Sequence, residues 1–162
     1  MTALRVAGFL NNSSVNGAGL RSVLFLSGCH HACPHCHNTL MQDEKYGETI
    51  DINNILTTIL KNEPIIDGVT ISGGEPFLQA KNLLPLIKLI KSHNLNIWIY
   101  SGYTYEELVL SKINIDILKL VDVLIDGRFI ISKHDKNLLY RGSSNQRIIS
   151  LVNGEINSIL SS

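Results

Sequence analysis

The residues of this sequence best suited to chemistry are three cysteines that lie in one short stretch. Cys29, Cys33 and Cys36 form a C-x3-C-x2-C run and are the only cysteines among the 162 residues. An odd number of thiols in so tight a cluster cannot build a disulfide framework, so the spacing predicts metal ligation. Thiolates favour iron–sulfur clusters or zinc over harder cations. A four-iron cluster normally takes four cysteines, so this run would leave one iron without a cysteine ligand.

A structural zinc site is the alternative interpretation of the same run. Zinc is often held by three cysteines and one histidine, and His30, His31, His35 or His37 is close enough in sequence to be the fourth ligand. Structural zinc sites usually pair two separate knuckles, whereas this sequence contains no second group of cysteines. If they bind no metal, His30 and His31 are expected to be loop residues exposed to solvent.

The composition predicts one ordinary domain that spans residues 1–162. The 14 basic and 14 acidic side chains cancel, so no broad electrostatic field favours nucleic acid or a membrane surface. The first ten residues lack the pattern of a signal peptide, and no apolar run approaches the roughly 20 residues that span a bilayer. We therefore expect a cytoplasmic protein, in a reducing compartment that keeps clustered thiols available to metal.

Short apolar runs alternate with helical patterns along the chain, which predicts a mainly parallel α/β sheet. Strands are expected at 4–10, 21–26, 68–72, 96–100, 121–125 and 148–152, and helices at 51–62, 79–93, 105–111 and 116–120. A complete (β/α)8 barrel needs about 200 residues or more. The economical prediction is a partial barrel of about five to six mainly parallel strands, open on one side. The cysteine loop takes up 27–38, and the tail at 153–162 is expected to fray.

Four polar motifs are expected directly after four of these strands. They are the cysteine loop, Gly73-Gly74-Glu75, Ser101-Gly102-Tyr103 and Asp126-Gly127-Arg128. In a parallel sheet such strand ends face the same way, so the motifs should converge on one site. The two glycines let the backbone approach a ligand, Glu75 offers an acceptor for an ammonium group, Arg128 suits a carboxylate, and Asp126 suits a pair of ribose hydroxyls. A ligand with an amino-acid end and a nucleoside end fits this set.

These motifs together resemble the radical S-adenosylmethionine superfamily. The resemblance rests on the cysteine spacing followed by Gly-Gly-Glu-Pro at 73–76. Within the superfamily, the sequence is most similar to the glycyl-radical activases of anaerobic ribonucleoside-triphosphate reductase. This similarity rests on Val-Asn-Gly-Ala-Gly-Leu-Arg at 15–21, Cys-His-Asn at 36–38, the runs at 98–103 and 122–129, and Arg-Gly-Ser-Ser-Asn-Gln-Arg at 141–147. The similarity extends over residues 10–149, nearly the whole chain.

The resemblance implies both a cofactor and a reaction. Cys29, Cys33 and Cys36 would hold a [4Fe-4S] cluster whose open iron chelates the amino and carboxylate groups of S-adenosyl-L-methionine. One electron from the cluster would cleave the sulfonium to methionine and a 5′-deoxyadenosyl radical, which takes hydrogen from a backbone glycine of the reductase large subunit. The resemblance also implies a flavodoxin-like electron donor. An activase of another glycyl-radical enzyme, of the pyruvate formate-lyase type, is the alternative within the superfamily.

The resemblance also implies roles for the remaining site residues. His35 and His37 would lie near the adenine, while Gly73, Gly74 and Glu75 would hold the methionine amino group. The ribose or carboxylate ends would be contacted by Ser101, Asp126 and Arg128. The run from Arg141 to Arg147 is assigned to the rim of the site or to the partner interface.

Overall fold

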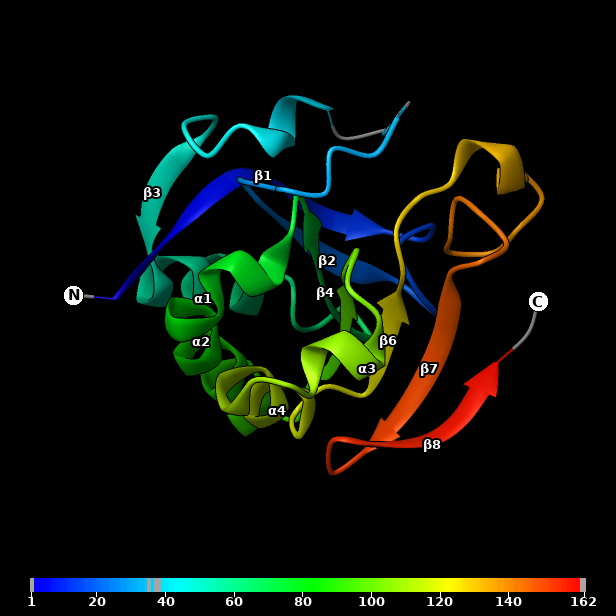
Figure 1. The fold of residues 1–162 in the computed structure, drawn as a ribbon. Coiled ribbons are helices and arrows are strands. Elements are labelled where there is room, and N and C mark those ends of the chain that lie inside the picture. Colours follow the sequence, from blue (N-terminus) through cyan, green and yellow to red (C-terminus); the bar gives the residue numbers. More distant parts are fainter. Residues whose placement is uncertain (1, 35, 37–38, 161–162) are drawn as a thin grey trace.

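The computed structural model describes residues 2–34, 36 and 39–160 of the chain. Its described part is built on a mixed sheet of eight strands in the order β3-β1-β2-β4-β5-β6-β7-β8 (Figure 1). The strands are β1 (Ala3–Ser13), β2 (Arg21–Leu26), β3 (Glu48–Asp51), β4 (Gly68–Gly73), β5 (Asn96–Tyr100), β6 (Val123–Asp126), β7 (Arg147–Val152) and β8 (Glu155–Leu160). The four middle strands β2, β4, β5 and β6 run parallel, and antiparallel pairs flank them at both ends.

The prediction of about five to six mainly parallel strands is therefore wrong in the number of strands and in how they pair, because the sheet is mixed. The six expected strands are present, but β3 and β8 were missed, and parallel pairing in the described chain joins only the four middle strands. All six residues of β8 are exposed, so β8 carries no buried face that an apolar pattern could reveal.

The tail that was expected to fray from residue 153 instead forms strand β8. Asn153 and Gly154 both have positive φ, at 52° and 81°, and join β7 to β8 in a tight hairpin. Asn-Gly suits such a turn because both central residues must adopt a left-handed conformation. Backbone pairing with β7 therefore holds β8 in place without burial of its side chains.

The helices gather on one side of the sheet (Figure 1). These are the α-helices α1 (Ile52–Lys61), α2 (Ala80–Ser92), α3 (Tyr105–Leu108) and α4 (Lys112–Leu118). The chain also forms the short 3-10 helices η1 (Thr39–Gln42), η2 (Pro76–Gln79) and η3 (Ile131–Lys133), of which η1 and η3 lie apart from the α-helices (Figure 1). Asp51 caps α1 by accepting a hydrogen bond from the Asn53 backbone N–H at 2.7 Å. The apolar faces of α1 and α2 are buried in the main core against the sheet, which explains why their 3.6-residue periodicity predicts them well. The helix expected at 116–120 begins four residues earlier, at Lys112.

The parallel middle strands bring the four motifs to the same edge of the sheet. The cysteine loop follows β2, Gly74-Glu75 follows β4, Ser101 follows β5 and Gly127 follows β6. Leu26 at the end of β2 pairs with Gly73 at the end of β4, so these two segments leave the sheet side by side. The expected convergence of the strand ends is confirmed. In the described chain, no helix has the length and apolar character needed to cross a bilayer.

A buried arginine joins three of the parallel strands at their opposite, amino-terminal ends. Arg21 is 1% exposed, and its guanidinium donates to Thr70 Oγ1 at 2.8 Å and to the carbonyl oxygens of Val69 and Asn96 at 3.0 and 3.1 Å. It also lies over the Trp98 ring, 5.4 Å from the centroid. Burial lowers the pKa of Arg21 to about 10. Hydrogen bonds to neutral acceptors thus compensate for the burial of this cation and tie β2, β4 and β5 together.

Replacing this arginine should destabilise the fold. Arg21→Met keeps a long side chain but removes the donors to Thr70 Oγ1 and to the carbonyl oxygens of Val69 and Asn96. We therefore expect the free energy of unfolding of the metal-free protein to fall by about 3 kcal/mol. Lys81→Met, at an exposed position of α2, is the control and should stay within about 0.5 kcal/mol of wild type. Urea unfolding measures both. Equal midpoints for Arg21→Met and Lys81→Met would contradict this role of Arg21.

Candidate functional site

The converging strand ends enclose a cavity of about 550 Å³, and all three cysteines line it. Cys29, Cys33 and Cys36 are partly exposed and form no disulfide. The other lining residues come mainly from the strand ends and from the β6–β7 loop, with Val15 and Asn16 added by the β1–β2 loop. They include Gly73, Gly74, Tyr100, Ser101, Gly127, Tyr140 and Arg141. The cavity thus combines a cluster of thiols with backbone and polar groups from four neighbouring strand ends.

Backbone hydrogen bonds hold the start of the cysteine loop. The N–H groups of Gly28 and Cys29 donate to the carbonyl oxygens of Met41 and Gln42, at 2.7 and 3.1 Å. Cys36 N–H donates to the Cys33 carbonyl at 3.1 Å, which closes a turn between the second and third cysteines. Burial raises the pKa of the Cys29 thiol, with the nearby Glu75 carboxylate acting in the same direction. A metal that binds Cys29 must therefore displace its proton.

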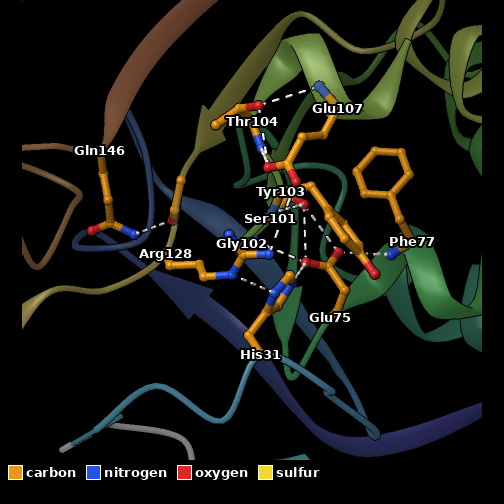
Figure 2. Close-up of polar contacts among 11 residues, drawn as sticks. His31, Glu75, Phe77, Ser101, Gly102, Tyr103, Thr104, Glu107, Arg128 and Gln146 are labelled. Atoms are coloured by element: carbon orange, nitrogen blue, oxygen red, sulfur yellow. Dashed lines mark hydrogen bonds and ion pairs between the residues drawn. The ribbon is translucent and has the colours of Figure 1, made fainter. Parts of the chain in front are cut away.

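Glu75 forms the polar centre beneath the cavity (Figure 2). Its carboxylate is 0% exposed and accepts hydrogen bonds from His31 Nε2 at 2.7 Å, Ser101 Oγ at 2.9 Å, and the backbone N–H groups of Gly102 and Phe77 at 2.8 and 3.0 Å. A buried carboxylate is tolerated only when its oxygens are hydrogen-bonded in this way. Glu75 and Ser101, both expected in the site, are therefore in direct contact with each other.

The two glycines before Glu75 are needed for close packing of the backbone. Gly73 has φ +111°, in the left-handed region that favours glycine. A Cβ on Gly73 would lie 2.3 Å from the Leu26 carbonyl oxygen, and one on Gly74 would lie 2.4 Å from that of Gly28. Both glycines also line the cavity, so the same close packing leaves their backbone groups beside the cysteines.

His31 is a member of this site that the sequence did not predict. The expectation that it is exposed is wrong, because its side chain is 5% exposed and lies between Glu75 and Arg128. Its neighbour His30 does follow the expectation, with a side chain 67% exposed that pairs with Glu44. Two adjacent histidines in a loop carry no sequence signal that tells the buried one from the exposed one.

Asp126 and Arg128 extend the site into a neighbouring cavity of about 390 Å³, which they help to line. The Asp126 carboxylate is 1% exposed and accepts from Arg147 Nε at 3.0 Å and from the Tyr105 N–H at 2.7 Å. This contact raises the pKa of Arg147. The Arg128 side chain is about half exposed, and its Nε donates to His31 Nδ1 at 3.1 Å. Arg147 at the end of the 141–147 run therefore positions Asp126.

The donor set fits a four-iron cluster with one open iron. Three thiols on one loop line one cavity, and the carboxylates of Glu75 and Asp126 are already bound by protein donors. Within 2–34, 36 and 39–160, no three Cys, His, Asp or Glu side chains are placed to share a single metal ion. The thiolates of a cluster bind different irons and need no common point. His35 and His37, expected near the adenine, lie outside the described residues.

Comparison with known proteins shows which family this chain resembles. The family model described as "4Fe-4S single cluster domain" matches residues 15–149. The anaerobic ribonucleoside-triphosphate reductase-activating protein of Pasteurella multocida is 40% identical over 147 residues, which cover 83% of this chain and 89% of that protein. The protein of the same name from Haemophilus influenzae is 38% identical over 145 residues, covering 83% and 90%.

A solved structure shares the fold at low sequence identity. The crystal structure of QueE from Escherichia coli superposes with a TM-score of 0.51 and 18% identity. The match covers 63% of this chain and about half, 53%, of the other. It supports the arrangement of the strands and helices alone.

The buried carboxylate at the centre of the site should contribute strongly to stability. Glu75→Gln places an amide NH2 against groups that are themselves donors, so we expect the metal-free protein to lose about 2 kcal/mol of unfolding free energy. Glu44→Gln removes the exposed partner of His30 and should change it by less than about 0.5 kcal/mol. Urea titration of the two variants compares a buried with an exposed Glu–His pair. A Glu75→Gln protein as stable as Glu44→Gln would contradict the inferred importance of the four donors.

Proposed function

Because the chain belongs to the family of anaerobic ribonucleoside-triphosphate reductase-activating proteins, we propose that it generates the glycyl radical of such a reductase by reductive cleavage of S-adenosylmethionine. It is a radical S-adenosylmethionine oxidoreductase that carries an iron–sulfur cluster. The observation that carries this proposal is the shared cavity, in which three cysteines of one loop face the ends of the parallel strands.

Cys29, Cys33 and Cys36 would hold the [4Fe-4S] cluster through their thiolates, and one iron would stay open to the amino and carboxylate groups of S-adenosylmethionine. A cluster held there would supply one electron for reductive cleavage of S-adenosylmethionine to methionine and a 5′-deoxyadenosyl radical, which would take a hydrogen atom from the glycine of the partner. The cofactor does the difficult chemistry, and the protein orients it and excludes water. A flavodoxin-like protein would donate the electron that reduces the cluster.

The strand-end residues would hold the S-adenosylmethionine in the two adjoining cavities. Gly73 and Gly74 present backbone groups beside the cysteines, where the methionine amino group would lie. Arg128 is half exposed and can offer its guanidinium to the ligand carboxylate. Glu75 and Asp126 are bound by protein donors, so a direct contact with the ligand requires that one of these hydrogen bonds be exchanged. Ser101 would hold the Glu75 carboxylate in place through its hydroxyl hydrogen bond.

The reductase large subunit would reach the cavity from the open side of the sheet. We infer a partial barrel of the radical S-adenosylmethionine type, because β3 and β8 form the two ends of the described sheet and the order closes no ring. An open side suits a substrate that is a polypeptide loop. Arg141 lines the cavity and begins the 141–147 run, which supports a place for this run at the rim or partner interface. Thiol ligands also support a reducing, cytoplasmic location.

Electron paramagnetic resonance on the partner tests the function directly. The reductase is incubated anaerobically with this protein, a reductant and S-adenosylmethionine, and we expect the doublet of a glycyl radical that is absent when S-adenosylmethionine is left out. Pyruvate formate-lyase in place of the reductase is the matched control for the alternative activase. A signal on the control alone would move the assignment to the other substrate. A protein purified anaerobically with one zinc and no iron would overturn both.

The cysteine ligands are tested by substitution in the loop. Cys33→Ser should abolish binding of the cluster and formation of 5′-deoxyadenosine, because serine replaces a soft thiolate ligand by a hard hydroxyl. His30→Ser introduces the same residue three positions earlier at an exposed site and should keep both. Iron and sulfide analysis with chromatography of the products measures the two effects. Production of 5′-deoxyadenosine by Cys33→Ser would refute the cluster assignment.

A further inference from the structure

His31 links the cysteine loop to two separate strand ends, and none of the roles assigned above explains this link. It comes from the loop between Cys29 and Cys33, yet its ring is held by Glu75 after β4 and by Arg128 after β6 (Figure 2). We propose that His31 is a positioning residue that holds the cysteine loop and Arg128 in the arrangement that receives the cluster and S-adenosylmethionine. The identity of the cluster and of S-adenosylmethionine rests on the proposed function, whereas the contacts of His31 do not depend on it.

The hydrogen-bond directions define what the side chain at this position must do. A guanidinium can only donate, so His31 Nδ1 accepts from Arg128 Nε, at 3.1 Å. The proton then lies on Nε2, which donates to Glu75 Oε1 at 2.7 Å. His31 therefore offers one acceptor, Nδ1, and one donor, Nε2, to these two partners. Of the other side chains of similar reach, glutamine offers the same pair of functions, whereas lysine offers only donors.

The structure also provides a space that fits the ring. A Cβ on Gly102 would lie 2.5 Å from the His31 ring, so any larger residue at Gly102 would displace the ring. The Tyr103 ring packs edge-on against His31, with centroids 4.5 Å apart. Gly102 has no positive φ, so its conformation does not require glycine; the close approach of the ring does.

These contacts connect groups that would bind the two cofactors. His31 stands two residues after Cys29 and two before Cys33, so its position constrains the loop that carries both thiols. Arg128, the proposed partner of the ligand carboxylate, is aimed through its bond to His31. Loss of the ring should therefore loosen the thiols and release Arg128 together, while the exposed neighbour His30 should affect neither.

The test compares His31→Ala, His31→Gln, Gly102→Ala and the control His30→Ala. In cluster-free protein, the rate of alkylation of the three thiols by iodoacetamide should rise about tenfold in His31→Ala, because the loop opens locally more often once its ring contacts are lost. Gly102→Ala, which displaces the ring but keeps the histidine, should raise it as well. His31→Gln and His30→Ala should stay near wild type. Circular dichroism checks that each variant is folded.

A second readout concerns the reconstituted protein. The paramagnetic signal of the reduced cluster is titrated with S-adenosylmethionine, and the midpoint concentration should rise about tenfold in His31→Ala and return towards wild type in His31→Gln. Wild-type rates and midpoints in His31→Ala would overturn the proposal. So would a His31→Gln protein that behaves like His31→Ala, because hydrogen bonding would then not be the cause. If the wild type fails to bind a cluster, the proposed function fails, while the alkylation rates still decide the role of His31.

Discussion

The carboxylate of Glu75 is bound by donors from three separate segments, in a place that solvent does not reach. The cysteine loop contributes His31, the start of η2 contributes the Phe77 N–H, and the segment after β5 contributes Ser101 and the Gly102 N–H. Removing a charged group from water costs several kcal/mol, and only this set of hydrogen bonds offsets that cost. The loops around the cavity are therefore constrained to one arrangement, because any loop that moves away leaves a buried charge short of a donor.

A second buried charge has the corresponding role at the other end of the parallel strands. Arg21 donates to groups of β4 and β5 and is itself part of β2. Glu75 and Arg21 thus lie at opposite ends of the same strands, and each is satisfied by neutral partners of its own. Between them the strands are packed with fully buried aliphatic side chains. The cysteine loop and the β6–β7 loop extend from this packed frame. The cavity can therefore be open to solvent while the loops that line it are held in place.

The proposed function requires a small chain to hold a cluster, a large ligand and a protein substrate, and the two cavities offer room for them. The two cavities adjoin through shared lining residues that include His31, Cys33 and Gly127. The larger cavity is lined by the three thiols and by Gly73 and Gly74, and the smaller one by Asp126 at the end of β6 and Arg128 after it. The antiparallel strands at the ends of the sheet, β3 and β8, add stability and width without closing it. The unclosed strand order supports the proposed approach of a polypeptide partner from the side.

Much of this protein follows from the sequence alone. The cysteine spacing, the apolar runs and the strand-end motifs predict thiolate–metal chemistry, six of the strands and the sheet edge where the motifs meet, because each depends on residues close together in the chain. The sequence could not show β8, which has no buried face, nor that His31 is buried while His30 is exposed. It also could not show that Glu75 and Asp126 are bound by protein donors. The burial of His31 and the donors to Glu75 and Asp126 depend on pairs far apart in sequence, such as His31 with Arg128 or Asp126 with Arg147. Only folding decides which of these donors meet which acceptors.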